Sequence, residues 1–394
     1  MKPISRRRFL ISGGGLIAAC AAAGLDPLAA QFTRAQAQED ISGAVFKGDG
    51  PRQLWKWSRE GYAYHAVDEN RVECLVCPNH CVLAPGDRSA CRSKVNVGGK
   101  LYSLAYGNPC AVHLDPIEKK PLYHFAPRTK SFSLAAAGCN FRCLNCQNWE
   151  ISQTRPEDVQ HHELFPAEAV SAARQAGAYS IAYTYSEPIS FYEYMLDTAR
   201  AARDAGLRNL LISNGYINRD PLLDLCRVIH AANINLKAYS DAIYRKLNGG
   251  RLEPVLATLK TLHDQGVHLE ITNLVVPTYV DDEDLVRRMC AWILKELGPD
   301  HPLHFLRFHP LYKLDRLPPT PVSALARFRE LALAEGIHYA YVGNVPNHDG
   351  NHTYCHQCRK LLIARTGYII PEYHLDGNRC AYCGTVIPGV WTTA

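Results

Sequence analysis

Residues 138–149 read Gly-Cys-Asn-Phe-Arg-Cys-Leu-Asn-Cys-Gln-Asn-Trp, and an apolar stretch at 131–137 that predicts a β-strand leads directly into them. Cys139, Cys143 and Cys146 therefore share one short loop at the end of a strand. Thiolates select iron–sulfur clusters or zinc over hard metals. A structural zinc site needs four closed ligands, whereas three thiolates hold three irons of a [4Fe–4S] cube. The spacing therefore predicts a cluster with one open iron.

Outward from this loop, short apolar strands alternate with amphipathic helices between about residues 131 and 345, in units of roughly 30 residues. We expect strands at 131–137, 179–184, 208–213, 233–239, 268–276, 303–309 and 338–343, and helices at 166–176, 189–205, 220–232, 252–265, 281–297 and 322–335. The pattern predicts an α/β fold with parallel strands, either an incomplete (β/α) barrel or a doubly wound open sheet. In both, active groups collect at the carboxyl ends of the strands.

Four polar residues lie at or just beyond the ends of the expected strands. Glu187, fixed by the proline after it, can accept hydrogen bonds from an ammonium group, or can simply start a helix. Ser213 and Asn214 offer short polar groups where a backbone can approach a ligand, or form a plain turn. Lys237 can bind a carboxylate or remain solvated. These residues are candidates for contact with a ligand.

The C-terminal part, residues 350–394, contains two Cys-x2-Cys pairs, Cys355 with Cys358 and Cys380 with Cys383, separated by 21 residues. Two such pairs predict a zinc ribbon with four sulfur ligands, in which zinc folds a module too small for a core of its own. A rubredoxin-like iron site and two disulfides are the alternatives.

The N-terminal part, residues 38–130, contains a second set of four, Cys74, Cys77, Cys81 and Cys91. Four sulfurs can close a zinc site, hold an auxiliary iron–sulfur cluster, or form disulfides. An auxiliary cluster would relay electrons or bind substrate.

Composition indicates a globular protein of 394 residues, with 47% hydrophobic and 21% charged residues. The net charge of +5 is mild, and the Lys and Arg residues are spread along the chain, so we expect no nucleic-acid partner.

Residues 1–37 are interpreted as a targeting segment. Residues 5–10 read Ser-Arg-Arg-Arg-Phe-Leu, which matches the twin-arginine export pattern, and residues 35–37 offer a small-residue cleavage site. We expect export, with the protein periplasmic or membrane-associated. Residues 17–20 also resemble a lipoprotein box, with Cys20 as a possible lipid anchor. If the signal is not used, the protein would be cytoplasmic.

Three further stretches of the sequence are typical of one group of related proteins. Residues 115–125 read Asp-Pro-Ile-Glu-Lys-Lys-Pro-Leu-Tyr-His-Phe, residues 183–188 read Tyr-Thr-Tyr-Ser-Glu-Pro, and residues 342–346 read Val-Gly-Asn-Val-Pro. Together with the three-cysteine loop, they resemble the radical SAM component of the AmmeMemoRadiSam system, a relative of pyruvate formate-lyase activating enzyme. The resemblance covers roughly residues 70–391.

The resemblance implies a partial (β/α) TIM-type barrel over residues 131–345, flanked by small cysteine-rich metal modules. It implies a [4Fe–4S] cluster on the three loop cysteines, and S-adenosylmethionine bound to the open iron and cleaved reductively to a 5′-deoxyadenosyl radical. Glu187, Ser213, Asn214 and Lys237 match segments that contact the methionine end. Two positions depart from the family pattern: Asn145 replaces an aromatic residue, and Asn235 replaces an aspartate.

The implied partners are an electron donor, Memo-like and AMMECR-like proteins, and an unknown substrate. One alternative is an activase of a glycyl-radical enzyme. Another is a non-catalytic exported iron–sulfur or electron-transfer protein.

Overall fold

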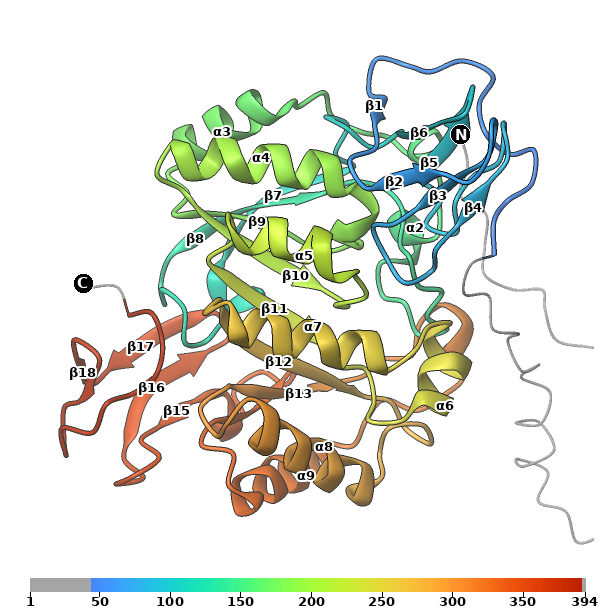
Figure 1. Cartoon of the computed structure of the whole chain (residues 1–394). Helices are drawn as coiled ribbons and strands as arrows, with labels where there is room; N and C mark the ends of the chain where they lie inside the picture. The colour runs from blue at the N-terminus through green and yellow to red at the C-terminus, as the bar shows by residue number, and fades with distance from the viewer. Residues whose placement is uncertain (1–43, 392–394) are drawn as a thin grey trace, which may run out of the picture. The chain divides into compact units, whose positions relative to one another are not determined.

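The computed structural model describes residues 44–391; the targeting segment expected at 1–37, with Cys20, lies outside this range. The centre of the fold is an eight-stranded sheet with the strand order β14-β13-β12-β11-β10-β9-β8-β7 (Figure 1). Its strands are β7 (Ala111–Pro116), β8 (Lys130–Ala135), β9 (Ser180–Tyr183), β10 (Arg208–Ser213), β11 (Ala231–Asn235), β12 (His268–Val275), β13 (Leu303–Arg307) and β14 (Ala340–Gly343).

Strand order decides between the two architectures that the sequence left open. From β8 to β14 each strand is parallel to its neighbour and adjacent to it in chain order. A doubly wound sheet reverses its strand order at a switch point, and this sheet does not. With β7 and β14 as its two edges, the sheet is a partial (β/α) barrel, which confirms the expected fold.

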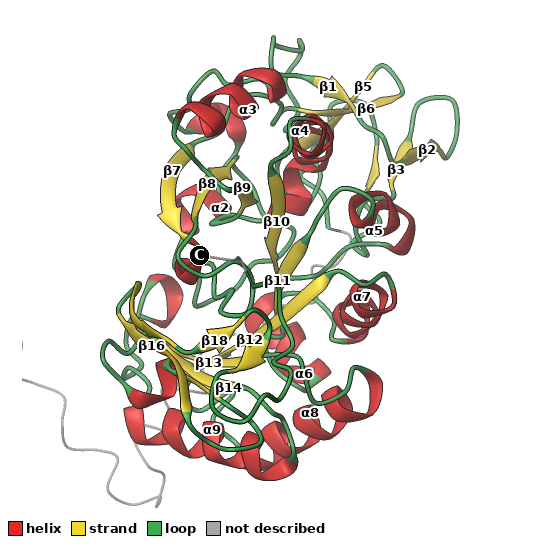
Figure 2. Ribbon diagram, turned by 90° about the vertical axis from the view of Figure 1, so that its left-hand side faces the viewer, coloured by secondary structure: helices red, strands yellow, loops and turns green. Residues whose placement is uncertain are grey.

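Six longer helices follow the parallel strands along the outer side of the curved sheet (Figure 2). They are α3 (Pro166–Gln175), α4 (Tyr192–Asp204), α5 (Arg219–Cys226), α7 (Glu253–Asp264), α8 (Glu283–Glu296) and α9 (Val322–Glu335). The residues at the helix ends are of the types that commonly begin, cap or end helices. Pro166 opens α3, Asp282 caps the first N–H groups of α8, and Gly336 ends α9 in the left-handed region.

Three expected elements have different boundaries in the structure. The helix expected at 220–232 ends at Cys226, and β11 begins at Ala231 rather than at 233. Val228 and Ile229 continue the apolar pattern, but they are buried in a turn between the two elements. Since β11 ends at Asn235, Lys237 lies in the loop beyond the strand. The helix expected at 189–205 is divided into a 3₁₀ turn, η3 (Pro188–Phe191), and α4.

The N-terminal residues form two small antiparallel sheets. One contains β1 (Arg59–Glu60), β6 (Lys100–Ser103) and β5 (Lys94–Val97), and the other contains β2 (Tyr64–Ala66), β3 (Val72–Cys74) and β4 (Val82–Leu83). Strand β7 belongs to the expected 38–130 module by sequence but pairs with β8 over six residues. The central sheet therefore begins before residue 131.

The C-terminal residues form the strands β15 (Thr353–Tyr354), β16 (Leu361–Thr366), β17 (Ile369–Tyr373), β18 (Leu375–Asp376) and β19 (Arg379–Cys380). They pack on a cluster of tyrosines from the central fold that includes Tyr123 and Tyr341. Buried Arg365 donates from Nη2 to the Tyr123 carbonyl at 3.0 Å. Within residues 44–391, no helix is long and apolar enough to span a bilayer.

A buried carboxylate closes the amino-terminal end of the sheet. Glu270 accepts hydrogen bonds from the backbone N–H groups of Tyr123 (3.0 Å) and His124 (2.7 Å), and lies 2.7 Å from His304 Nε2. His124 in turn bonds the Pro388 carbonyl through Nδ1 at 2.7 Å. This network joins the run at 115–125 to the C-terminal residues after β19, at the end of the sheet opposite the cysteine loop.

Candidate functional site

The cysteine loop connects β8 to the short helix α2 (Trp149–Ser152). Its backbone is held by a π-helical turn, η4 (Tyr244–Asn248): the N–H of Arg142 donates to the Asn248 carbonyl at 2.8 Å, and that of Leu144 donates to the Leu247 carbonyl at 2.9 Å. Phe141 is fully buried against this turn. A Cβ on Gly250 would lie 2.2 Å from Phe141 Cε1, so only glycine fits there. Long-range contacts thus fix the shape of the loop.

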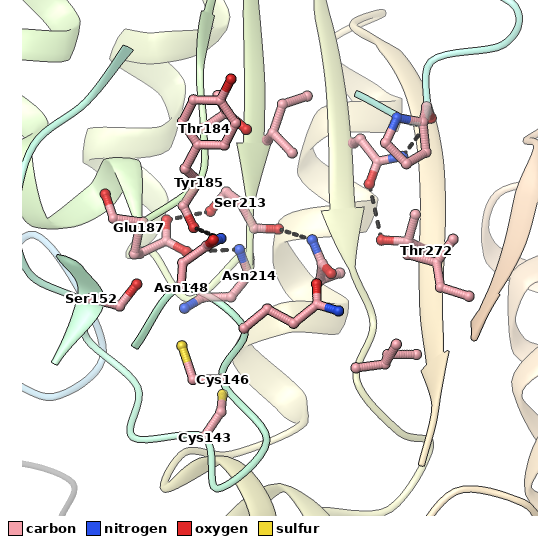
Figure 3. A pocket seen from close by; sticks show the side chains of 18 of the residues that line it. Cys143, Cys146, Asn148, Ser152, Thr184, Tyr185, Glu187, Ser213, Asn214 and Thr272 are labelled. Atoms are coloured by element: carbon pink, nitrogen blue, oxygen red, sulfur yellow. Dashed lines mark hydrogen bonds between the residues drawn. The ribbon is translucent and has the colours of Figure 1, made fainter. Parts of the chain in front are cut away.

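All three loop cysteines face one cavity of about 500 Å³. Each sulfur receives a hydrogen-bond donor. The Phe141 N–H lies 3.3 Å from Cys139 Sγ, and Asn248 Nδ2 lies 3.1 Å from Cys143 Sγ. Cys146 interacts with the Ser152 hydroxyl and a backbone N–H. Figure 3 shows Cys143 and Cys146 pointing towards the strand ends that carry Glu187 and Asn214.

These residues fit an iron–sulfur cluster. The three thiols are free of disulfides, and their N–H and O–H donors are those that stabilise metal-bound sulfur. Burial raises the pKa of Cys139 well above its usual range, so an unligated Cys139 keeps its proton, whereas a coordinating thiol loses it. The Oδ1 of Asn145 is buried in the same cavity without a hydrogen-bond partner among the described residues. A polar ligand in the cavity would supply one.

Glu187 lies at the carboxyl end of β9 and joins the next strand end. Its Oε1 accepts from the Ser213 hydroxyl at 2.7 Å, and its Oε2 accepts from the Asn214 N–H at 2.9 Å. The side chain is 3% exposed, and burial raises the pKa of this carboxyl despite the bonds from Ser213 and Asn214. A buried carboxyl with acceptor capacity to spare is suited to an ammonium ligand.

Asn214 links this carboxylate to the cysteine loop. Its Nδ2 donates to Asn140 Oδ1 at 2.8 Å, and Asn140 Nδ2 donates to the Tyr216 carbonyl at 2.7 Å. Lys237, in the loop after β11, donates from Nζ to Oδ1 of Asn235, the last residue of that strand, at 3.2 Å, and both residues line the cavity. The structure therefore brings Glu187, Ser213, Asn214 and Lys237 to the cavity that the three cysteines face.

Lys119, Lys120 and Tyr185 also line the cavity and belong to a second charged cluster. Lys120 Nζ donates to Asp115 Oδ2 at 2.6 Å, Lys119 Nζ donates to Oδ1 at 2.9 Å, and the Tyr185 hydroxyl donates to the same carboxylate. Burial alone would raise the pKa of Asp115. The hydrogen bonds, of which the one from Lys120 has the largest effect, hold that pKa well below its usual range. Burial lowers the pKa of Lys120 to about 8. The cluster has one more cation than anion.

Comparison with known proteins assigns the chain to a family. The Radical SAM superfamily model matches residues 134–289. The "Uncharacterized protein MJ0808" of Methanocaldococcus jannaschii is 45% identical over 84% of this chain and 98% of its own length. The chain belongs to the radical SAM superfamily. Membership implies a [4Fe–4S] cluster and S-adenosylmethionine.

Other similarities cover less of this radical SAM protein. The pyruvate formate-lyase 1-activating enzyme of Escherichia coli K12 is 28% identical over 49% of this chain and 84% of its own length. The crystal structure of a radical SAM methyltransferase from Sphaerobacter thermophilus has 14% identity and a TM-score of 0.45, over 75% of this chain and 81% of the other.

The C-terminal cysteines converge tightly. The sulfurs of Cys355, Cys358, Cys380 and Cys383 all lie within 4.8 Å of one another. The Cys355–Cys383 and Cys358–Cys380 pairs are 3.7 Å apart and form no disulfide. Four sulfurs around a tetrahedral zinc at a Zn–S distance of about 2.3 Å lie about 3.8 Å apart. The alternative of two disulfides for this set is therefore wrong, and one tetrahedral ion fits the four sulfurs.

Several residues in and around the cavity had no assigned role in the sequence. Lys119 and Lys120 belong to the run that marks the subgroup, but nothing local showed that they meet Tyr185. Asn248 lies in a turn with no motif, and only the fold brings it to Cys143. Trp149, four residues after Asn145, stacks on Tyr312 with ring centroids 5.3 Å apart.

Proposed function

We propose that this protein is an enzyme that binds S-adenosylmethionine at a [4Fe–4S] cluster held by Cys139, Cys143 and Cys146 and cleaves it reductively. The observation that carries the proposal is the convergence, around one cavity, of three sulfurs and the polar groups of Glu187 and Lys237. When bound, the cluster and S-adenosylmethionine supply one-electron cleavage of a carbon–sulfur bond and abstraction of hydrogen from a substrate.

The protein residues supply binding and orientation. Glu187 accepts hydrogen bonds from the amino group of the ligand, and Ser213 and the Asn214 N–H hold that carboxylate in place. Lys237 pairs with the ligand carboxylate. Asn214 fixes the distance between this end of the cavity and the cysteine loop through Asn140. No general base is required for abstraction of a hydrogen atom.

The part of the cavity lined by Lys119, Lys120 and Tyr185 is left for the substrate. Its single excess positive charge suits a substrate with a carboxylate or another anionic group near the reacting carbon.

Anaerobic reconstitution with iron and sulfide, followed by S-adenosylmethionine and dithionite, tests this function. We expect release of 5′-deoxyadenosine. The Cys143→Ala variant should release none, whereas the matched control Cys226→Ala, in which a cysteine at the end of α5 is changed, should keep the activity. No 5′-deoxyadenosine from fully loaded protein would favour the non-catalytic alternative, an exported iron–sulfur or electron-transfer protein.

Within the superfamily, we assign the protein to the AmmeMemoRadiSam type, on the strength of the run at 115–125 and the three-cysteine loop. Memo-like and AMMECR-like proteins would then be its partners, with a separate electron donor. We also propose a structural zinc on the four C-terminal cysteines, and export by the twin-arginine route.

A second candidate is activation of a glycyl-radical enzyme, which the similarity to the Escherichia coli activating enzyme favours. The two functions differ in the product. An activase would generate a stable glycyl radical, visible by electron paramagnetic resonance, when mixed with its partner enzyme. The first function predicts no such signal.

A further inference from the structure

The N-terminal cysteines converge from three segments of the chain. Cys74 ends β3, Cys77 and Cys81 flank a tight turn, and Cys91 lies in the loop before β5. All four side chains are buried, at most 8% exposed, and none forms a disulfide. The Cys74 N–H donates to the Cys81 carbonyl at 3.0 Å, and the N–H of Ala90, next to Cys91, lies 3.4 Å from Cys81 Sγ. The disulfide alternative for this set is therefore wrong, and the four buried thiols come from segments that contact one another.

The distances between these sulfurs differ from those of a single-ion site. Among the described residues, the four C-terminal cysteines are the one group of three or more His, Cys, Asp or Glu side chains whose ligand atoms all lie within 4.8 Å of one another. The N-terminal four are spread more widely, as are Cys139, Cys143 and Cys146. A cube spreads its thiolates because each binds a different iron, whereas one zinc draws four sulfurs to about 3.8 Å. The wider spacing favours an iron–sulfur cluster.

Polar groups surround these sulfurs. The hydroxyls of Ser89 and Ser93 lie 3.0 and 3.2 Å from Cys91 Sγ, and the Ala90 N–H donates to Cys81 Sγ at 3.4 Å. The Lys94 ammonium is buried beside Cys74 and Cys91 and is paired with Glu193. A neutral buried thiol needs neither donors nor a cation, but cluster-bound thiolates are stabilised by both.

The four-cysteine site directly contacts the three-cysteine loop. Gly138 has φ +107°, and a Cβ there would lie 2.5 Å from the Cys91 carbonyl oxygen. Asn79, in the turn between Cys77 and Cys81, donates from Nδ2 to the Asn140 carbonyl at 2.9 Å. The two residues that flank Cys139 are therefore each in contact with a segment of the four-cysteine site.

We propose that Cys74, Cys77, Cys81 and Cys91 hold a second [4Fe–4S] cluster, which passes electrons to the cluster on the three-cysteine loop. Four cysteines leave no iron open, so this cluster carries electrons rather than binding a ligand. One electron enters from an iron–sulfur or flavin donor protein, reduces the second cluster, and leaves it oxidised again when it reaches the first. His80, on the same turn, is exposed, so the path from the surface is short. The receiving end of this relay depends on the proposed function.

Iron, sulfide and zinc contents of anaerobically reconstituted full-length protein test the second cluster without any assay of turnover. We expect about eight irons and eight sulfides per chain, with about four irons in Cys77→Ser/Cys81→Ser and about four in Cys143→Ala. The Cys226→Ser control should keep all eight. Zinc in the N-terminal site, or about four irons in the unchanged protein, would overturn the proposal.

The relay has its own test. Stopped-flow absorbance should show that a reduced flavodoxin-type donor reduces the three-cysteine cluster several-fold more slowly in Cys77→Ser/Cys81→Ser than in the unchanged protein. An equal rate would overturn the relay. Retention of the C-terminal zinc and of four irons would show that the variant is folded. Loss of S-adenosylmethionine cleavage with eight irons present would count against the proposed function and not against the second cluster.

Discussion

Removing the charge of Lys94 is expected to destabilise the protein strongly. Lys94 Nζ, on β5, lies 2.5 Å from Glu193 Oε2 on α4, and both side chains are at most 1% exposed. The other hydrogen bond of this carboxylate comes from the Tyr62 N–H at 3.3 Å. Burial alone would lower the pKa of Lys94, but the charge of Glu193 raises it, so Lys94 keeps its charge.

Removing one partner of a buried ion pair costs about 3–5 kcal/mol, because the other charge remains buried and unpaired. An unfolding entropy of roughly 2.1 cal/mol/K per residue, over about 350 residues, gives about 0.7 kcal/mol/K. Lys94→Met should therefore lower Tm by about 4–7 °C. Lys94→Met/Glu193→Leu removes both charges and should recover most of that loss, since apolar pairs replace buried ion pairs at little cost.

Differential scanning calorimetry of anaerobic protein measures these shifts. Lys100→Met is the matched control. Its partner Glu60 lies 3.3 Å away and both side chains are about half exposed, so we expect a loss below about 1 kcal/mol. Additive losses in the double variant, or a Lys94→Met shift no larger than that of the control, would refute the reasoning.

Three further results are expected. Lys237→Met should weaken S-adenosylmethionine binding about 10- to 150-fold, because a hydrogen bond to a charged group is worth about 1.5–3 kcal/mol; equilibrium dialysis of cluster-loaded protein measures this, with exposed Lys295→Met unchanged. Burial lowers the pKa of His124 to about 4 from 6.5, so the unfolded chain binds a proton that the folded chain does not. The free energy of unfolding should fall as pH drops from 6.5 to 4, by up to about 3 kcal/mol. Urea titrations at several pH values should show that the free energy of unfolding of His124→Gln depends less steeply on pH over this range. Cys383→Ser should lose one zinc per chain by mass spectrometry and become sensitive to protease after residue 352, and full zinc retention would count against the ribbon assignment.

Much of the fold was predictable because its signals are local. The bounds of β10 and α9 agree with expectation, since Gly215 and Gly336 end the elements and apolar periodicity fills them. The β11 boundary failed because Val228 and Ile229 extend an apolar pattern through a turn. Periodicity records burial, and burial is shared by helices, strands and buried turns.

The sequence by itself determined the cysteine spacings, the alternation of strands and helices, and the polar residues at the strand ends. These are properties of neighbouring residues. The tertiary structure alone decided the sequential strand order, the contact of Asn248 with Cys143, and the meeting of Lys120 with Tyr185. It also placed Cys91 against Gly138. Each of these depends on which distant segments pack together, and packing is set by the summed burial of the whole chain rather than by any local pattern.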